Sequence, residues 1–161
     1  MIKKFNLLFV TLFNVGKIKY LPGSFASLLT CFLFFLLNNI FDTQILIFLT
    51  LLIFLYSFLA INTSFDSFDS NDPKEIVIDE VVGQMIPLLA IPIYETLYPT
   101  IQIYYFIISF LFFRLFDIWK PFPIDYVDNN TKGALGIMLD DIIAGVYTII
   151  FISIIFFFLG G

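Results

Sequence analysis

Three short segments place charged residues beside long apolar stretches of the chain. They are Ile-Val-Ile-Asp-Glu at 76–80, Phe-Arg-Leu-Phe-Asp-Ile-Trp-Lys-Pro at 113–121, and Leu-Asp-Asp-Ile-Ile-Ala-Gly at 139–145. An ionisable group at the centre of a membrane helix costs about 2.5 to 3.5 kcal/mol on insertion scales. Charges with so high a cost in apolar surroundings indicate a functional site.

The acidic residues of two segments point to a hard cation. Asp79 is followed by Glu80, and Asp140 by Asp141, and carboxylates that are crowded together repel each other unless a cation lies near them. The chain has no histidine, and its single cysteine, Cys31, lies within an apolar stretch. A ligand set made only of oxygen suits Mg²⁺ before Ca²⁺ or Mn²⁺ and argues against zinc or copper.

The basic residues of the middle segment would add a site for an anion. Arg114 and Lys120, together with a divalent cation, would neutralise a phosphate group. The alternative is structural, because Arg114 and Asp117 share a helix face and would pair, while Lys120 would pair with another carboxylate. The excess of carboxylates over nearby basic residues favours a functional site. Without histidine or a Gly-rich phosphate loop, metal-assisted attack of water on a phosphoester is the chemistry that remains.

The composition indicates an integral membrane protein. The chain of 161 residues is 60% hydrophobic and 13% charged, and its mean hydropathy is +1.00, which exceeds the apolar content of ordinary soluble domains. No linker or repeat divides it, so residues 1–161 are expected to form a single domain. Because backbone groups in lipid must be hydrogen-bonded internally, we predict an all-α polytopic fold with about five membrane-embedded helices, at about residues 25–41, 45–61, 76–93, 101–118 and 135–159. A short interfacial helix is expected within residues 5–13.

The basic residues predict an orientation in the membrane. If the N-terminus is cytoplasmic, five crossings place all 8 Lys and Arg residues at the cytoplasmic side, which is the positive-inside pattern. The charged segments then open the third and fifth spans and close the fourth. We therefore expect the charged helix ends to converge on the cytoplasmic face.

The charged segments together resemble the phosphatidylglycerophosphatase A family. The resemblance rests on Ile-Asp-Glu-Val-Val-Gly at 78–83, Phe-Arg-Leu-Phe-Asp-Ile-Trp-Lys-Pro-Phe-Pro-Ile at 113–124 and Gly-Ile-Met-Leu-Asp-Asp-Ile-Ile-Ala-Gly at 136–145. It covers nearly the whole chain and includes Pro22-Gly23-Ser24, where Ser24 stands in place of the threonine that is usual in the family and keeps its hydroxyl.

The resemblance implies a Mg²⁺-dependent lipid phosphatase of the bacterial cytoplasmic (inner) membrane, with its N-terminus and site on the cytoplasmic side. Its reaction would release inorganic phosphate from phosphatidylglycerophosphate and leave phosphatidylglycerol. The implied metal ligands and catalytic carboxylates are Asp79, Glu80, Asp140 and Asp141, with Asp117 as a further ligand or base. The implied phosphate and headgroup contacts come from Arg114, Lys120, Pro22, Gly23 and Ser24.

Two other functions are compatible with buried carboxylates. A proton- or cation-coupled transporter would place its charges near the membrane midplane on broken helices, and Pro87 and Pro92 are candidates for such breaks. An accessory scaffold without activity would use the same charges for stability alone. The expected partner is a phospholipid substrate within the membrane, no nucleic acid is expected, and the oligomeric state stays open.

Overall fold

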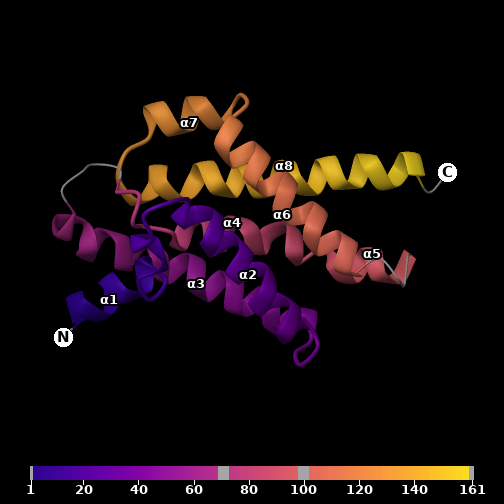
Figure 1. The fold of residues 1–161 in the computed structure, drawn as a ribbon, viewed down its shortest axis with the longest axis horizontal. Coiled ribbons are helices and arrows are strands. Elements are labelled where there is room, and N and C mark those ends of the chain that lie inside the picture. The colour runs from indigo at the N-terminus through magenta and orange to yellow at the C-terminus, as the bar shows by residue number, and fades with distance from the viewer. Residues whose placement is uncertain (1, 69–72, 98–101, 160–161) are drawn as a thin grey trace.

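The computed structural model describes residues 2–68, 73–97 and 102–159, and every regular element within them is a helix (Figure 1). The elements are α1 (Ile2–Val10), the 3₁₀ turn η1 (Val15–Lys17), α2 (Pro22–Asn38), α3 (Thr43–Ser64), the 3₁₀ turn η2 (Phe65–Ser67), α4 (Ile78–Leu88), α5 (Ile91–Leu97), α6 (Gln102–Trp119), α7 (Ile124–Asn130) and α8 (Gly133–Leu159). The predicted all-α class is therefore confirmed for this part of the chain.

Three helices in the described part of the chain are long and apolar enough to cross a membrane. They cover Thr43–Ser67, Gln102–Trp119 and Gly133–Phe158, which correspond to the second, fourth and fifth expected segments. Residue 101, where the fourth expected segment starts, lies outside the described residues. The first segment forms α2, an apolar helix of 17 residues, and the third is divided between α4 and α5. By length and composition the structure thus supports three spans, and the expected number of about five is not confirmed.

Proline accounts for the division of the third segment. Pro87 lies in the last turn of α4, where a proline removes one backbone hydrogen bond and disfavours continuation of the helix. Pro92 is the second residue of α5, a position at which a missing N–H has no cost. With 11 residues, α4 is about 16 Å long and cannot cross a hydrocarbon core of about 30 Å by itself.

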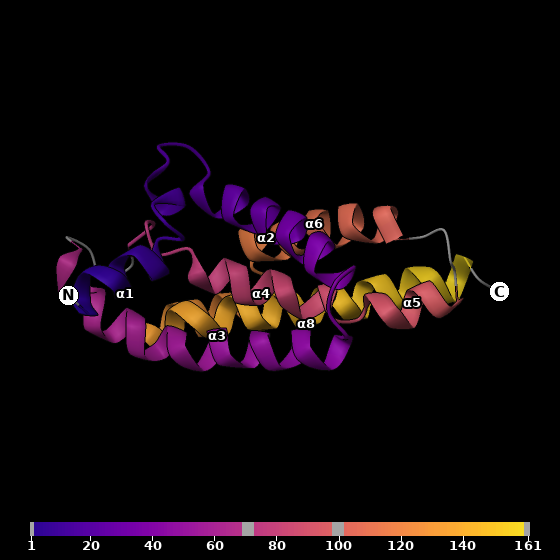
Figure 2. The same cartoon turned by 90° about the horizontal axis from the view of Figure 1, so that it is seen from below.

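The short helix α4 lies at the centre of the molecule. It contacts α2, α3, α6 and α8, and in Figure 2 it runs between the layer of α2 and α6 and the layer of α3 and α8. Its close approach to α8 depends on two glycines, since a Cβ atom at Gly145 would lie 2.5 Å from the carbonyl oxygen of Gly83. Helices in membranes commonly approach each other through such small residues.

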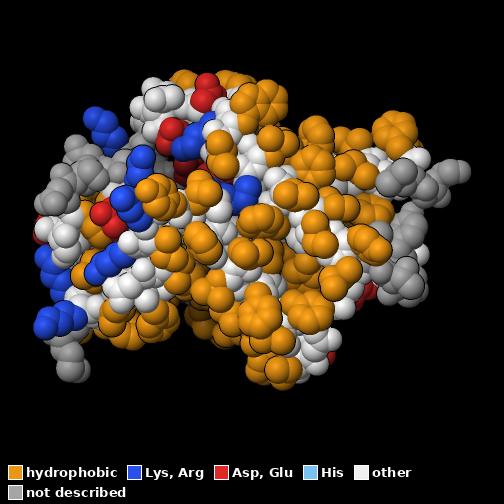
Figure 3. Space-filling view, in the orientation of Figure 1, with side chains coloured by type: hydrophobic (Ala, Val, Ile, Leu, Met, Phe, Trp, Pro, Cys, Tyr) orange, Lys and Arg blue, Asp and Glu red, His pale blue; other side chains and the backbone are white. Residues whose placement is uncertain are grey.

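The basic side chains gather at one end of the bundle. In Figure 3 the Lys and Arg atoms lie at the left, where Figure 1 places the N-terminus and α7, while hydrophobic side chains cover the right-hand part of the visible face. The helices α2, α4 and α8 begin at this end, and α3 and α6 finish there (Figure 1). We call it the basic end.

Two short helices complete the basic end. The short helix expected within residues 5–13 forms slightly earlier, as α1. It is attached to α3 through Asn6, whose side chain hydrogen-bonds Thr63 at 2.5 Å and Tyr56 at 2.6 Å. The sequence did not indicate α7, which follows α6 after the turn at Pro121 and Pro123. It packs against α8.

Candidate active site

A polar cavity of about 230 Å³ opens among the helices at the basic end. All the site residues expected from the sequence line it except Ser24. They are Pro22 and Gly23 from α2, Asp79 and Glu80 from α4, Arg114 and Asp117 from α6, Lys120 after α6, and Asp140 and Asp141 from α8. Residues from four separate stretches of sequence thus meet in one place.

The start of α4 positions the first acidic pair. The backbone N–H of Val77 donates a hydrogen bond of 2.9 Å to the carbonyl oxygen of Val10, and Ile76, Val77 and Ile78 are buried. This apolar anchor holds the first turn of α4, in which Asp79 and Glu80 lie. An acidic first turn is also favoured by the helix dipole.

Helix α8 brings Asp141 to this pair. Carboxylate oxygens of Asp79, Glu80 and Asp141 all lie within 4.8 Å of one another. The approach requires Gly83, because a Cβ atom there would lie 2.7 Å from the carbonyl oxygen of Asp141 and 2.9 Å from its Cβ atom. Asp140 is not a member of this group of three.

Four carboxylate oxygens of the cavity lack hydrogen-bond partners among the described residues. They are Asp79 Oδ1, Glu80 Oε2, Asp140 Oδ1 and Asp141 Oδ1, and all four are buried. Buried polar atoms are nearly always satisfied by protein, water or an ion. An all-oxygen group with free lone pairs at this spacing fits a hard divalent cation such as Mg²⁺.

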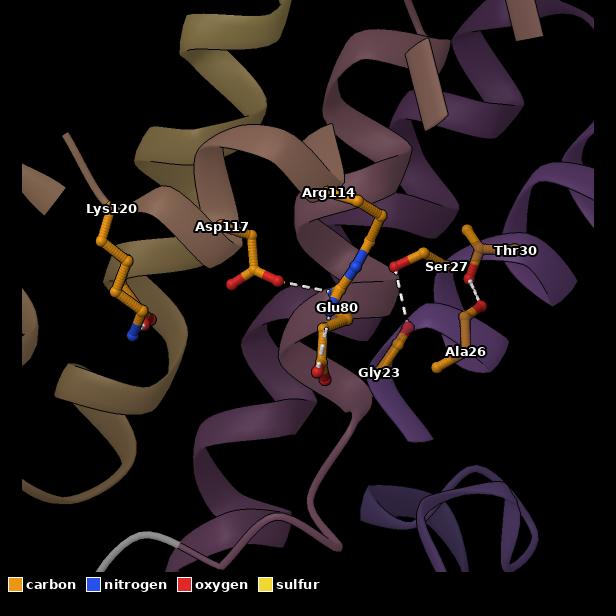
Figure 4. Close-up of polar contacts among 9 residues, drawn as sticks. Gly23, Ala26, Ser27, Thr30, Glu80, Arg114, Asp117 and Lys120 are labelled. Atoms are coloured by element: carbon orange, nitrogen blue, oxygen red, sulfur yellow. Dashed lines mark hydrogen bonds and ion pairs between the residues drawn. The ribbon is translucent and has the colours of Figure 1, made fainter. Parts of the chain in front are cut away.

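Arg114 links α6 to the acidic group. Its Nη1 atom lies 2.6 Å from Asp117 Oδ2 and 3.9 Å from Glu80 Oε1 (Figure 4). The three side chains are largely buried. The pairing of Arg114 with Asp117 that the helix spacing suggested is therefore present, and Arg114 also faces the carboxylates of α4.

Lys120 occupies the turn that ends α6. Its backbone is in the left-handed region with φ 46°, and its N–H caps the helix by donating to Phe116 O at 2.8 Å. The side-chain Nζ lies 2.8 Å from Asp140 Oδ2 and 2.8 Å from Asp128 Oδ1. Burial lowers the pKa of Lys120, but its hydrogen bonds to Asp128 and Asp140 outweigh this effect and leave the pKa above its ordinary value. The ammonium group is therefore charged throughout the neutral range.

The start of α2 closes one wall of the cavity. A Cβ atom at Gly23 would overlap Glu80 Oε1 and would lie 3.2 Å from Arg114 Nη1, so the backbone approaches both side chains closely. Ser27 Oγ donates a hydrogen bond of 3.0 Å to Gly23 O (Figure 4), which ties the first turn of α2 together. Ser24 lies on the same turn but does not line the cavity.

Sequence reasoning missed two charged residues of this site. Asp128, on α7, pairs with Lys120, and Lys74 lies on the cavity wall. Both belong to polar stretches that resemble solvated loops. One feature of the sequence could have indicated Asp128. It belongs, with Asp125 and Lys132, to a cluster of charged residues just before the motif at 136–145.

Charge determines what the cavity can bind. Six acidic side chains line it, Asp79, Glu80, Asp117, Asp128, Asp140 and Asp141, against three basic ones, Lys74, Arg114 and Lys120. A phosphate group would be repelled from a site with this excess of negative charge. A divalent cation would compensate for the excess and leave Arg114 and Lys120 to contact an anion.

Comparison with known proteins finds a matching family model and related proteins. The family model described as phosphatidylglycerophosphatase A matches residues 8–156. A candidate phosphatidylinositol-3-phosphatase of Bacteroides thetaiotaomicron is 35% identical over 145 residues, which cover 88% of this chain and 87% of that one. A phosphatidylglycerophosphatase A of Haemophilus influenzae is 34% identical over 138 residues, 86% of this chain and 80% of that one. A phosphatidylglycerophosphatase A of Escherichia coli is 42% identical over 76 residues, 47% and 40% of the two chains. No solved structure gives a significant match.

Proposed function

The chain belongs to the phosphatidylglycerophosphatase A family, and on this basis we propose that it hydrolyses the terminal phosphomonoester of phosphatidylglycerophosphate. The products are phosphatidylglycerol and inorganic phosphate, so the reaction belongs to phospholipid biosynthesis. The observation that carries the proposal is the cavity at one end of an apolar helical bundle, which six acidic and three basic side chains line. Such a position suits a substrate whose acyl chains stay in the membrane while its phosphate reaches the interface.

The acidic group would hold Mg²⁺. Asp79, Glu80 and Asp141 supply oxygen ligands from α4 and α8, and the unpartnered oxygens described above are available to complete the set. When bound, the ion would activate a water molecule and offset the negative charge of the phosphate.

The remaining residues then take distinct roles. Arg114 and Lys120 contact the phosphate oxygens and stabilise charge that develops on them as the ester bond breaks. Asp117 orients Arg114, because one of its oxygens already lies 2.6 Å from Nη1. We assign Asp140 to the attacking water: Lys120 holds its Oδ2, while Oδ1 has no partner among the described residues. Asp140 Oδ1 would accept the water proton as the water oxygen bonds to phosphorus and the bond from phosphorus to the glycerol oxygen breaks. A proton from solvent would then complete the hydroxyl group of phosphatidylglycerol.

We also propose an orientation and a number of crossings. The basic end faces the cytoplasm of a bacterial inner membrane, as the positive-inside rule requires. Helix α2 and the pair α4 and α5 then cross the bilayer alongside the three longer helices. The short helix α4 is compatible with this arrangement because its neighbours α2, α3, α6 and α8 shield it from lipid.

The transporter alternative receives no support from the geometry. Its charges should lie where a helix is broken near the midplane. Here the break lies after Leu88, at the opposite end of α4 from Asp79 and Glu80. The carboxylates belong to the basic end of the bundle.

The test is phosphate release by the purified protein in detergent micelles, with Mg²⁺ and with a chelator. Phosphatidylglycerophosphate should be the best substrate, against phosphatidic acid and against phosphatidylinositol 3-phosphate, which the name of the Bacteroides relative suggests. Asp141→Asn should abolish release while the variant stays folded, which would also exclude a purely structural role for the carboxylates. Absence of release by folded, Mg²⁺-loaded protein would refute the phosphatase.

A further inference from the structure

We propose that an apolar groove between α2 and α6 binds one acyl chain of the lipid whose phosphate enters the polar cavity. This inference rests on the proposed function and concerns how the substrate is held. The groove has a volume of about 230 Å³, and its lining includes Leu28, Cys31 and Phe32 from α2 and Phe106 and Ile107 from α6.

The groove lies on the same two helices as the polar cavity, farther from the basic end. Gly23 of α2 and Arg114 of α6 line the cavity; Leu28 lies five residues after the first, and Ile107 seven residues before the second. At 1.5 Å per residue the groove begins about 8 to 10 Å from the cavity along each helix. Figure 2 shows α2 and α6 running together in one layer. A charged site followed by an apolar one matches the polarity of a phospholipid from its headgroup to its chains.

The exposed side of the groove gives an acyl chain a lateral path into it from the surrounding lipid. Cys31 and Phe106 form a buried floor, each 7% exposed, whereas Leu28, Phe32 and Ile107 are more than half exposed at 53%, 59% and 53%. A groove with a buried floor and open walls can receive a chain sideways from the surrounding lipid. The lipid would then not need to leave the membrane.

A second apolar cavity is less suited to the same lipid. It has a volume of about 180 Å³ among α1, α2, α3 and α4, and Leu33, Ile78 and Met85 are among its lining residues. No residue of α6 lines it, so it does not share the pair of helices that carries Gly23 and Arg114. The second cavity and the groove share no lining residue.

The groove would act by positioning the substrate. An acyl chain that moves from lipid into an apolar groove gains little from the hydrophobic effect, because lipid is equally apolar. What it gains is orientation, which places the phosphate in the cavity in a reactive position. The expected effect on turnover is therefore moderate.

The test is to fill the groove and to compare two substrates. In Ile107→Trp and Cys31→Trp, kcat/KM for long-chain phosphatidylglycerophosphate should fall on the order of tenfold, while hydrolysis of the same headgroup without acyl chains stays unchanged. Phe32→Ala, which widens the groove without adding bulk, should weaken the preference for the long-chain substrate. Melting in detergent verifies that each variant is folded.

Two control variants separate the groove from other causes. Ile154→Trp adds bulk at an exposed position of α8 outside the groove, and Leu33→Trp fills the second cavity; both should behave as wild type. Equal loss with both substrates, no loss with either, or a chain-specific loss in Leu33→Trp would overturn the proposal. If the wild type releases phosphate from neither substrate, the proposed function itself fails, which is a distinct result.

Discussion

Among single residues, Gly23 has the most restrictive surroundings in the cavity. A methyl group there would collide with the Glu80 carboxylate and approach Arg114. Gly23→Ala should therefore displace Glu80 and lower kcat on the order of 100-fold, as a misplacement of about 1 Å does elsewhere. Ser24→Ala is the matched control and should keep wild-type rates in the same phosphate-release measurement. An equal loss in Ser24→Ala would mean that its hydroxyl contacts the headgroup, as the family resemblance implied.

Lys120 gives a second prediction at this scale, one that depends on pH. Its hydrogen bonds to Asp128 and Asp140 place its pKa above the ordinary value for lysine. The ammonium group is therefore fully charged at neutral pH and loses its charge only as the pH rises through this raised pKa. Asp128→Asn removes the negative charge of one of these two partners and should move the alkaline limb of the pH–rate profile to lower pH. KM should change by no more than about threefold, because Asp128 is partly exposed and its ion pair is weak. Asp125→Asn, on the same helix but outside the cavity, should change neither quantity.

The sequence predicts the site residues that lie within apolar stretches. It does not predict those that lie in polar stretches. Asp79, Glu80, Arg114 and Asp141 stand out because charge is costly in such surroundings. Asp128 has no such contrast, since its neighbours in the sequence are polar. Its contact with Lys120 depends on the turn of the chain after α6, which residue types alone do not specify.

At the scale of elements, the contact between α4 and α8 positions the acidic group. Gly83→Ala should force these helices apart, since its Cβ would lie 2.7 Å from both Asp141 O and Phe113 Cε2. Overpacking of this kind costs about 1 to 3 kcal/mol. We expect a lower melting temperature in detergent together with loss of phosphate release. Val146→Leu, which adds one methylene at an exposed position of α8, should leave both unchanged; an unchanged Gly83→Ala would show that the contact can relax.

The elements also show where hydropathy is insufficient to predict the helices. Hydropathy located the three long helices, because a long apolar run in a membrane protein is expected to form a spanning helix. It treated residues 76–93 as one span, although Pro87 and Pro92 divide them into α4 and α5. The cost of a break depends on whether neighbouring helices shield the freed backbone groups, and this information lies in the packing around α4.

For the molecule as a whole, the acidic cavity predicts that binding of Mg²⁺ stabilises the folded protein. An ion that binds the folded state alone stabilises it, by about 2.7 kcal/mol at 100 times its dissociation constant. Mg²⁺ should raise the melting temperature of the wild type, and a chelator should reverse the rise. In Asp141→Asn the rise should be absent, whereas Ile154→Trp should keep it. A rise of equal size in Asp141→Asn would place the cation elsewhere.

The orientation of the whole molecule can be tested through its single cysteine. In a Cys31→Ser background, a new cysteine at the basic end, Lys17→Cys, is compared with one at the opposite end, Asp42→Cys; both positions are exposed. Positive charges are retained on the cytoplasmic side, so a membrane-impermeant thiol reagent should label Asp42→Cys in spheroplasts with an intact inner membrane. It should label Lys17→Cys only after that membrane is permeabilised. The reverse pattern would place the cavity on the outer face and would refute the proposed orientation.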